Sequence, residues 1–140
     1  MKEKFCLIDS DILIFILKNN EKVITKSLDY QNKHGKLIIS ELTYYECLRG
    51  FKFENSLKKI ESFNEFIKKQ TIVKQLNKDI FNKASDIFCK LRKNGKPTGE
   101  FDLLIGATAL INNYKLITNN EKHYENICSL FDLKMENWIK

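Results

Sequence analysis

The sequence predicts an α/β domain with a mostly parallel central sheet of four or five strands flanked by helices. Short apolar runs recur along the 140 residues, and segments with helical periodicity lie between them. This alternation of strands and helices is typical of parallel sheets. The length corresponds to one domain, residues 1–140, and a hydrophobic fraction of 43% is enough for a continuous core.

Five short apolar runs are the expected strands. They are residues 4–8, 36–40, 71–76, 115–118 and, with the weakest pattern, 133–136. In open α/β sheets, ligands bind beyond the carboxyl ends of the strands. Asp9 directly follows the first run. We therefore expect Asp9 at the position where such sheets carry functional groups.

The segments between these runs have helical spacing. One apolar stripe comprises residues 57, 60, 63 and 67, and a second comprises residues 80, 81, 84, 87, 88 and 91. Either Asn77 or Asp79 is a suitable cap for the second helix. Residues 102–113 are apolar on nearly every side, which predicts a buried helix. The clearest loop is residues 94–99, which contain the single proline, Pro97, and lead into that helix.

The composition favours an intracellular protein with a polyanionic partner. The net charge is +6, but 22 of the 24 basic residues are lysines spread along the chain, a pattern that also fits a solvated surface. The four cysteines lack C-x-x-C spacing and adjoin apolar residues, so we expect buried free thiols rather than disulfides or a zinc site. No signal-like N-terminus and no membrane-length apolar run is found, so we expect a cytoplasmic protein without a membrane span.

Four carboxylates stand next to the most apolar segments: Asp9, Glu46, Glu100 and Asp102. Carboxylates are costly to bury unless they are paired or bound to a metal. Their oxygens suit hard cations, so we expect them to gather around Mg²⁺, with Mn²⁺ as the alternative. Individually, Glu46 fits a solvated helix position, and Glu100 and Asp102 fit the first turn of a helix, where acids interact favourably with the dipole.

Three segments together resemble the PIN-domain nucleases, and most closely the VapC-type toxins of prokaryotic toxin–antitoxin pairs. Residues 7–14 read LIDSDILI, with an acid and a hydroxyl residue after an apolar strand. Residues 39–50 read ISELTYYECLRG, with a helical Glu shortly before Gly. The most specific match is GEFDLLIGATA at residues 99–109, and residues 116–124 and 133–138 are similar to the family's last strands. The order and spacing of the segments agree over the whole chain.

The resemblance implies a metal-dependent endoribonuclease that acts as a toxin, cleaves RNA, possibly tRNA, and forms a homodimer inhibited by a small antitoxin protein. Asp9 and Asp102 would be the primary metal ligands, assisted by Glu46, because carboxylates that hold divalent ions support phosphodiester hydrolysis. Many members carry a fourth Asp where this chain has Asn120. Asn120 offers an oxygen without charge, so the number of bound metal ions, one or two, stays open. Glu121 or Glu100 could supply the missing negative charge.

Several residues near these motifs have more than one interpretation. Ser10 could bind a ligand oxygen or the scissile phosphate, and Asp11 is either a supporting acid or a turn residue. Arg49 could pair with Glu46 or contact RNA. The remaining candidates are assigned without catalytic roles: Tyr44 and Tyr45 to core and interface, and His34 and His123 to the surface.

Two other functions remain possible from the sequence. The D-x-D pair of Asp9 and Asp11 also resembles the opening motif of haloacid-dehalogenase phosphatases, but no late acid pair follows the strand that ends at Thr118. A catalytically degenerate domain that only binds RNA or a protein partner is the second alternative, and Asn120 is its sole support.

Overall fold

A five-stranded sheet forms the centre of the protein. The computed structural model describes residues 4–140, so the first three residues of the predicted domain lie outside the described part. The strands are β1 (Cys6–Ile8), β2 (Leu37–Ser40), β3 (Thr71–Lys74), β4 (Lys115–Ile117) and β5 (Met135–Glu136). Their order is β3-β2-β1-β4-β5, and every pairing is parallel. The predicted fold class and all five predicted strand positions are confirmed, although each strand is shorter than its apolar run.

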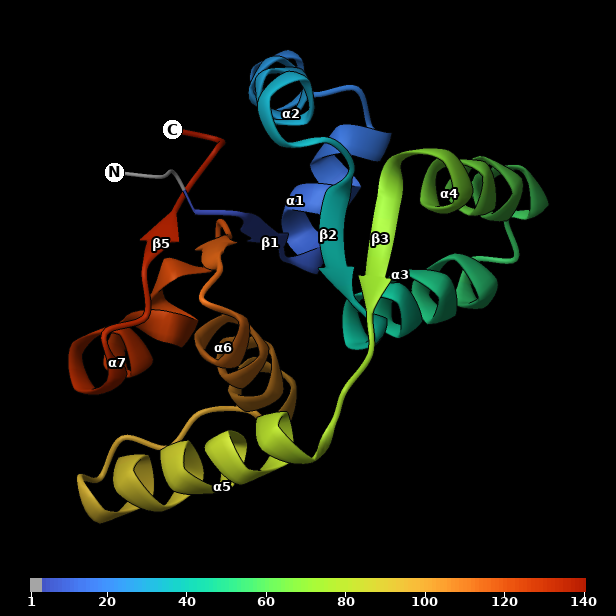
Figure 1. Ribbon diagram of the computed structural model, residues 1–140. Helices are drawn as coiled ribbons and strands as arrows, with labels where there is room; N and C mark the ends of the chain where they lie inside the picture. The colour runs from blue at the N-terminus through green and yellow to red at the C-terminus, as the bar shows by residue number, and fades with distance from the viewer. Residues whose placement is uncertain (1–3) are drawn as a thin grey trace.

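Helices cover both faces of this sheet (Figure 1). They are α1 (Ser10–Leu17), α2 (Glu21–His34), α3 (Glu41–Phe53), α4 (Leu57–Gln70), α5 (Lys78–Lys93), α6 (Glu100–Asn112) and α7 (Glu121–Phe131). The helices α1 to α4 pack with one core cluster, and α5 to α7 pack with another. The strands separate these two clusters, which gives three layers.

Side chains along each central strand alternate between the two clusters. Ile8 and Ile39 belong to the cluster under α1 to α4, whereas Leu7, Ile38 and Leu116 belong to the cluster under α5 to α7. Because successive side chains of a strand point to opposite faces, a strand covered on both faces needs a continuous apolar run. The sequence has such runs at β1 and β2, which is why both could be predicted as strands.

The predicted helical stripes are partly confirmed. Asn77 is the cap of α5, where its Oδ1 atom accepts a hydrogen bond of 2.9 Å from the Ile80 backbone N–H. The α5 residues at 80, 84, 87 and 91 are buried, but those at 81 and 88 remain half-exposed. In α4 the stripe is shifted: Leu57 is 77% exposed, and Phe66 is buried beside Phe63. Leu57 begins the helix at a surface corner, so its side chain has no layer above it to contact.

The helix α6 is buried as predicted, apart from its last turn. Residues 103, 105 and 106–109 are buried, whereas Ile111 is 38% exposed. A Cβ atom on Gly106 would lie only 3.1 Å from a methyl carbon of Ile127. The small residue therefore allows α7 to pack closely against α6. This packing matters for the site because α6 and α7 each contribute a side chain to it.

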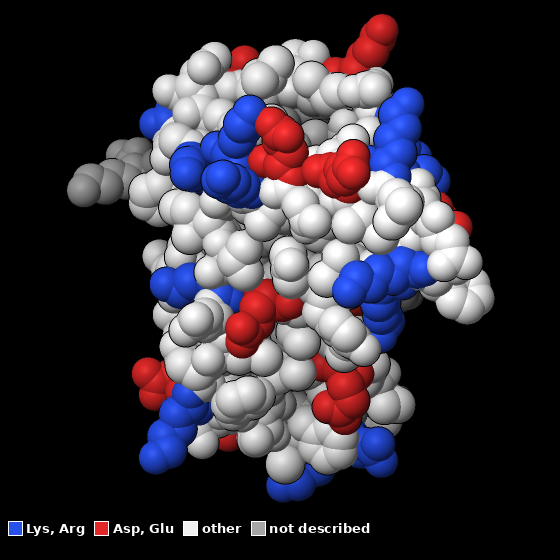
Figure 2. Space-filling model, turned by 90° about the vertical axis from the view of Figure 1, so that its right-hand side faces the viewer, with Lys and Arg blue, Asp and Glu red and all other residues white. Residues whose placement is uncertain are grey.

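On the face that Figure 2 shows, Lys and Arg residues are interspersed with Asp and Glu residues. Positive and negative charges are therefore not separated on this face. No disulfide joins the cysteines within residues 4–140, and Cys6 and Cys47 are buried, as predicted. The expected burial is wrong for Cys89, which is exposed because it lies on the outer side of α5. No helix within residues 4–140 combines the length and the apolar character that crossing a membrane requires.

Candidate active site

The candidate site lies at the carboxyl ends of the two central strands. Asp9 follows β1 and Thr118 follows β4, and the Asp9 backbone N–H donates a hydrogen bond of 2.9 Å to the Ile117 carbonyl. The chain builds β2 and β3 on one side of β1 and later places β4 and β5 on the other side. The edge between β1 and β4 is therefore the topological switch point, where doubly wound sheets bind their ligands.

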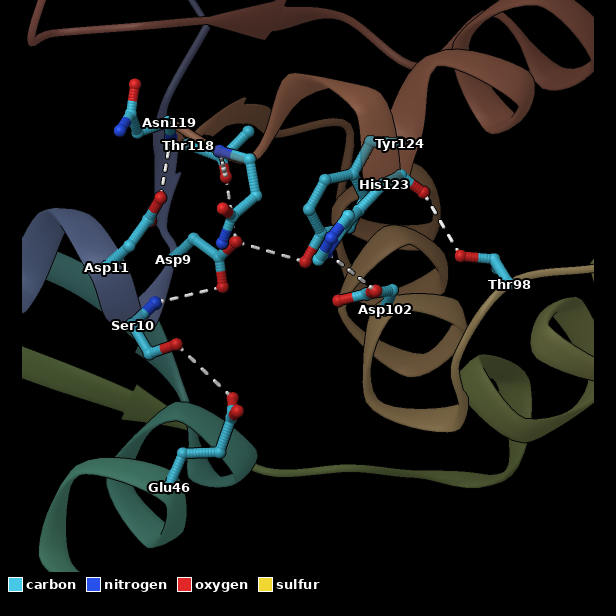
Figure 3. A network of polar contacts seen from close by, with 11 residues as sticks. Asp9, Ser10, Asp11, Glu46, Thr98, Asp102, Thr118, Asn119, His123 and Tyr124 are labelled. Atoms are coloured by element: carbon cyan, nitrogen blue, oxygen red, sulfur yellow. Dashed lines mark hydrogen bonds and ion pairs between the residues drawn. The ribbon is translucent and has the colours of Figure 1, made fainter. Parts of the chain in front are cut away.

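Asp9 is held by three hydrogen bonds from three parts of the chain (Figure 3). Its Oδ1 atom accepts from the Ser10 backbone N–H at 2.9 Å. Its Oδ2 atom accepts from the Thr118 hydroxyl at 2.9 Å and from the Tyr124 hydroxyl at 3.1 Å. Asp9 is also the N-terminal cap of α1, and only 4% of the residue is exposed. These contacts fix the orientation of the carboxylate.

Burial makes the charged form of Asp9 costly. Loss of solvation, reinforced by the nearby charge of Asp11, raises the pKa of Asp9 from 3.8 to about 7, although its hydrogen bonds partly offset this effect. Burial and the carboxylates of Asp9 and Asp102 raise the pKa of Tyr124, so its phenol stays protonated and donates to Asp9. A buried carboxylate with a strongly raised pKa, close to other acids, is typical of functional sites.

Asp11, Ser10 and Glu46 lie on the α1 and α3 side of Asp9. Asp11 accepts hydrogen bonds of 2.8 Å from the backbone N–H groups of Ile12 and Asn119, and burial raises its pKa. The Ser10 hydroxyl approaches Glu46 Oε1 at 3.4 Å, the long end of a hydrogen bond. Burial raises the pKa of Glu46 as well, and the negative charges of Asp102 and Asp11 add to this effect.

Asp102 approaches from the opposite side, in the first turn of α6 (Figure 3). Its Oδ2 atom lies 3.3 Å from His123 Nδ1 at the start of α7. The Thr98 hydroxyl donates to the His123 carbonyl at 3.1 Å and so ties this part of α7 to the loop before α6. The structure therefore brings Asp9, Glu46 and Asp102 toward one cleft from a strand end and two helices, as the sequence predicts.

Two of the predicted site residues, Glu100 and Glu121, have other contacts, and Asn120 adjoins the site through its backbone. Glu100 lies on the other side of α6, where it lines a separate hollow with Phe81 and Phe88. Asn120 is exposed at the start of α7, and its backbone N–H, rather than its side chain, contacts the Thr118 hydroxyl at 3.0 Å. Glu121 forms an ion pair of 2.6 Å with Lys140 and accepts a hydrogen bond from Asn137.

A shallow hollow of about 260 Å³ opens beside these acids. Ser10, Asp11 and Glu46 line it from the acidic side, and Arg49 lines it further along α3. Arg49 forms no ion pair with Glu46 in the described part of the chain, although its charge acts on the Glu46 carboxylate. Asp9 and Asp102 are not among the described residues that line it.

The donors of this cleft fit a hard cation by their chemistry. Asp9, Glu46 and Asp102 offer carboxylate oxygens, the ligands that Mg²⁺ and Mn²⁺ prefer. A divalent ion would also offset the mutual repulsion and the burial cost that raise the pKa values of Asp9 and Glu46. Among residues 4–140, no three Asp, Glu, His or Cys side chains already have the spacing of a closed metal site.

The shifted pKa of Asp9 predicts how stability depends on pH without metal. A carboxyl group whose pKa rises from 3.8 to about 7 on folding binds its proton more tightly in the folded state. Stability is therefore full below the unfolded pKa, falls as the pH rises toward the folded pKa, and is level above it, for a total loss of roughly 4 kcal/mol. We expect urea unfolding in EDTA to show that Asp9→Asn gains stability over wild type at pH 8 and gains much less at pH 5. An equal difference at both pH values would contradict this assignment.

Sequence reasoning missed three residues of the site: Thr118, Tyr124 and His123. Thr118 carried a usable signal, because it follows the strand next to β1 just as Asp9 follows β1. Tyr124 and His123 gave none, because their contacts depend on how α7 packs against α6. His123 had been assigned to the surface; its side chain is 57% exposed, yet it contacts Asp102.

The chain is similar to a known domain family and to several known proteins. A family model described as the PIN domain matches residues 6–127. A ribonuclease VapC1 from Haemophilus influenzae strain R2866 is 30% identical over 138 residues, which cover 96% of this chain and 98% of that protein. A tRNA(fMet)-specific endonuclease VapC from Shigella flexneri is 26% identical, with coverage of 94% and 96%.

Solved structures show the same fold. A chain of VapBC-1 from nontypeable Haemophilus influenzae superposes with a TM-score of 0.82 at 29% identity, covering 97% of this chain and 99% of that one. A chain of VapBC2 from Rickettsia felis, bound to a DNA fragment from the promoter, has a TM-score of 0.83 at 20% identity, with coverage of 96% and 98%. The similarity therefore extends over nearly the whole chain in each case.

Proposed function

Because the chain belongs to the PIN-domain family, and within it to the VapC group, we propose that it is a metal-dependent endoribonuclease and the toxin of a toxin–antitoxin pair. The observation that carries this proposal is the buried carboxylate of Asp9 at the topological switch point, with Glu46 and Asp102 facing it from two helices. The relatives named as ribonucleases and as a tRNA-specific endonuclease support an RNA substrate.

Asp9, Asp102 and Glu46 would hold the ion, Mg²⁺ or Mn²⁺. When bound, it supplies positive charge at the phosphoryl oxygens and a water of lowered pKa. The chain's own residues orient this site. Thr118 and Tyr124 fix the Asp9 carboxylate, and the Ser10 hydroxyl can turn from Glu46 toward a phosphate oxygen, because its present contact is long.

RNA cleavage is expected to require a divalent cation. The carboxylates of Asp9, Glu46 and Asp102 repel a phosphodiester unless a cation adds positive charge. The measurement is cleavage of a labelled RNA in Mg²⁺, in Mn²⁺, and in excess EDTA followed by Mg²⁺ restoration. Undiminished cleavage in EDTA would refute the metal-dependent mechanism.

A protein partner is the second part of the proposal. Solved relatives are VapBC complexes, which supports a small antitoxin as the inhibitor of this chain. At the corner between α3 and α4, Phe53 is 90% exposed and Leu57 is 77% exposed, and such apolar surface usually marks an interface. We propose that the inhibitor presents a basic side chain, such as Arg, to Asp9, Glu46 and Asp102, because guanidinium pairs well with carboxylates. A homodimer is proposed by family resemblance.

A further inference from the structure

Arg49 lies over two aromatic rings at the edge of the acidic cleft. Its Cζ atom is 5.1 Å from the centre of the Tyr45 ring and 5.2 Å from the centre of the Phe101 ring. The two rings contact each other, with centres 6.1 Å apart and planes inclined by 59°. We call these three side chains the Arg49 platform. Arg49 is exposed, and Tyr45 is 52% exposed, so both can contact a ligand.

The Arg49 platform joins the two helices that carry the acids. Arg49 follows Glu46 by three residues on α3, so both lie on neighbouring turns of one helix face. Phe101 directly precedes Asp102 on α6. Among the described residues that line the hollow beside Ser10, Asp11 and Glu46, Arg49 is the sole cation. The platform therefore adjoins both Glu46 on α3 and the start of α6, where Asp102 lies.

The guanidinium N–H donors of Arg49 are available to a ligand. Within the described part of the chain, the Arg49 guanidinium lies over the faces of two rings, forms no ion pair and donates no hydrogen bond to another residue. Two rings hold the side chain in place, so little of its rotational freedom is lost when a ligand binds. A cation held in this way next to the carboxylates of Asp11 and Glu46 suits a ligand that brings negative charge to the acidic site.

We propose that the Arg49 platform positions the substrate: Arg49 binds a phosphate next to the scissile one, and Tyr45 stacks with the adjacent unpaired base. This inference rests on the proposed function, because it concerns the same RNA. Guanidinium binds phosphate through paired hydrogen bonds, which a lysine ammonium cannot reproduce. Aromatic rings stack with bases of any sequence, provided that the base is not already stacked in a duplex. Phe101 supports Arg49 from the α6 side.

The test measures RNA binding separately from cleavage. All variants are made in an Asp9→Asn background and titrated, in Mg²⁺, against a short fluorescent RNA without self-complementarity. Arg49→Ala and Tyr45→Ala should each weaken binding by about tenfold, Arg49→Lys should recover only part of the loss, and Tyr45→Phe should bind like the background. Loss of one phosphate contact should also lower the salt dependence of log K by about 0.7 in Arg49→Ala but not in Tyr45→Ala.

The chain offers a matched control. Arg92 is its only other arginine, and its Cζ atom lies over the Phe88 ring at 4.7 Å on α5. Arg92→Ala removes the same charge and the same type of ring contact as Arg49→Ala. Because Arg92 lies on α5 and not in the platform, its loss should leave RNA affinity unchanged. Equal losses of RNA affinity in Arg49→Ala and Arg92→Ala would show that the effect comes from net charge alone and would overturn the proposal. A changed molecular mass with unchanged RNA affinity would instead assign the platform to contacts between copies of the chain, which also overturns it.

Cleavage assays with Asp9 intact separate this inference from the proposed function. If wild type cleaves RNA, Arg49→Ala should raise KM about tenfold with little change in kcat, because Arg49 holds substrate beside the reacting phosphate. Cleavage with unchanged KM in Arg49→Ala and Tyr45→Ala would overturn the platform and leave the nuclease proposal intact. Absence of cleavage by wild type, together with platform-dependent RNA binding, would refute the nuclease and retain the platform.

Discussion

Asp9→Asn is expected to lower the rate of RNA cleavage by about a thousandfold while the protein stays folded. The substitution keeps the size of the side chain and removes the charge that would attract a cation. The Asn oxygen can still accept from the Ser10 N–H, and the hydroxyls of Thr118 and Tyr124 can rotate to accept from the Asn amide. The loss should therefore come from the missing carboxylate rather than from disrupted packing.

The control for this prediction is Asp86→Asn. Asp86 is exposed on α5, away from the cleft, so the same chemical change should leave activity and stability unaltered. The measurements are single-turnover cleavage in Mg²⁺ and thermal unfolding, followed by calorimetric Mg²⁺ titration. Asp102→Asn should also weaken Mg²⁺ binding, and Glu46→Gln nearly as much. Wild-type Mg²⁺ affinity in both Asp9→Asn and Asp102→Asn would place the metal elsewhere.

Expression of the wild-type chain alone is expected to arrest the growth of a bacterial host, and Asp9→Asn is expected to permit normal growth. The physical reason is that an RNA-cleaving enzyme acts repeatedly, so a few molecules suffice, whereas a protein that only binds RNA needs stoichiometric amounts. Growth after induction is measured for wild type, Asp9→Asn and the Asp86→Asn control in a host that lacks any neighbouring antitoxin gene.

Co-expression of the product of an adjacent small gene should restore growth of the strain that carries wild type. Immunoblots are needed to show equal protein levels, because a degraded variant would be harmless for a trivial reason. If wild type and Asp9→Asn are equally harmless at equal levels, the toxin proposal fails. If both arrest growth equally, RNA or partner binding without catalysis is the better explanation, and the degenerate-domain alternative gains.

The sheet could be predicted from sequence because buried parallel strands leave a local signal. The runs at β1, β2 and β4 have apolar residues at successive positions. Asp9 directly follows the run at β1. The exposure of Leu57 and Phe81 could not be predicted, because a helical stripe records periodicity but not which residues a second layer covers.

The site was predictable where its residues belong to motifs and unpredictable where it depends on packing. Asp9, Glu46 and Asp102 were identified because each adjoins an apolar segment. Glu121 was offered as a substitute for the missing fourth Asp, but Lys140 and Asn137 contact its carboxylate, and both are distant from it in sequence. The place of Arg49 over Tyr45 and Phe101 likewise depends on the distance between α3 and α6.

The hydrogen-bond donors to Asp9 also determine when, during synthesis of the chain, the site around Asp9 can form. Thr118 and Tyr124 lie 109 and 115 residues after Asp9, and β4 must pair beside β1 before either hydroxyl can reach it. A ribosome-bound chain that ends before Lys115 therefore leaves Asp9 solvated, with an ordinary carboxyl group and no fixed orientation. Interrupted translation therefore yields fragments in which the hydrogen bonds that orient Asp9 are missing.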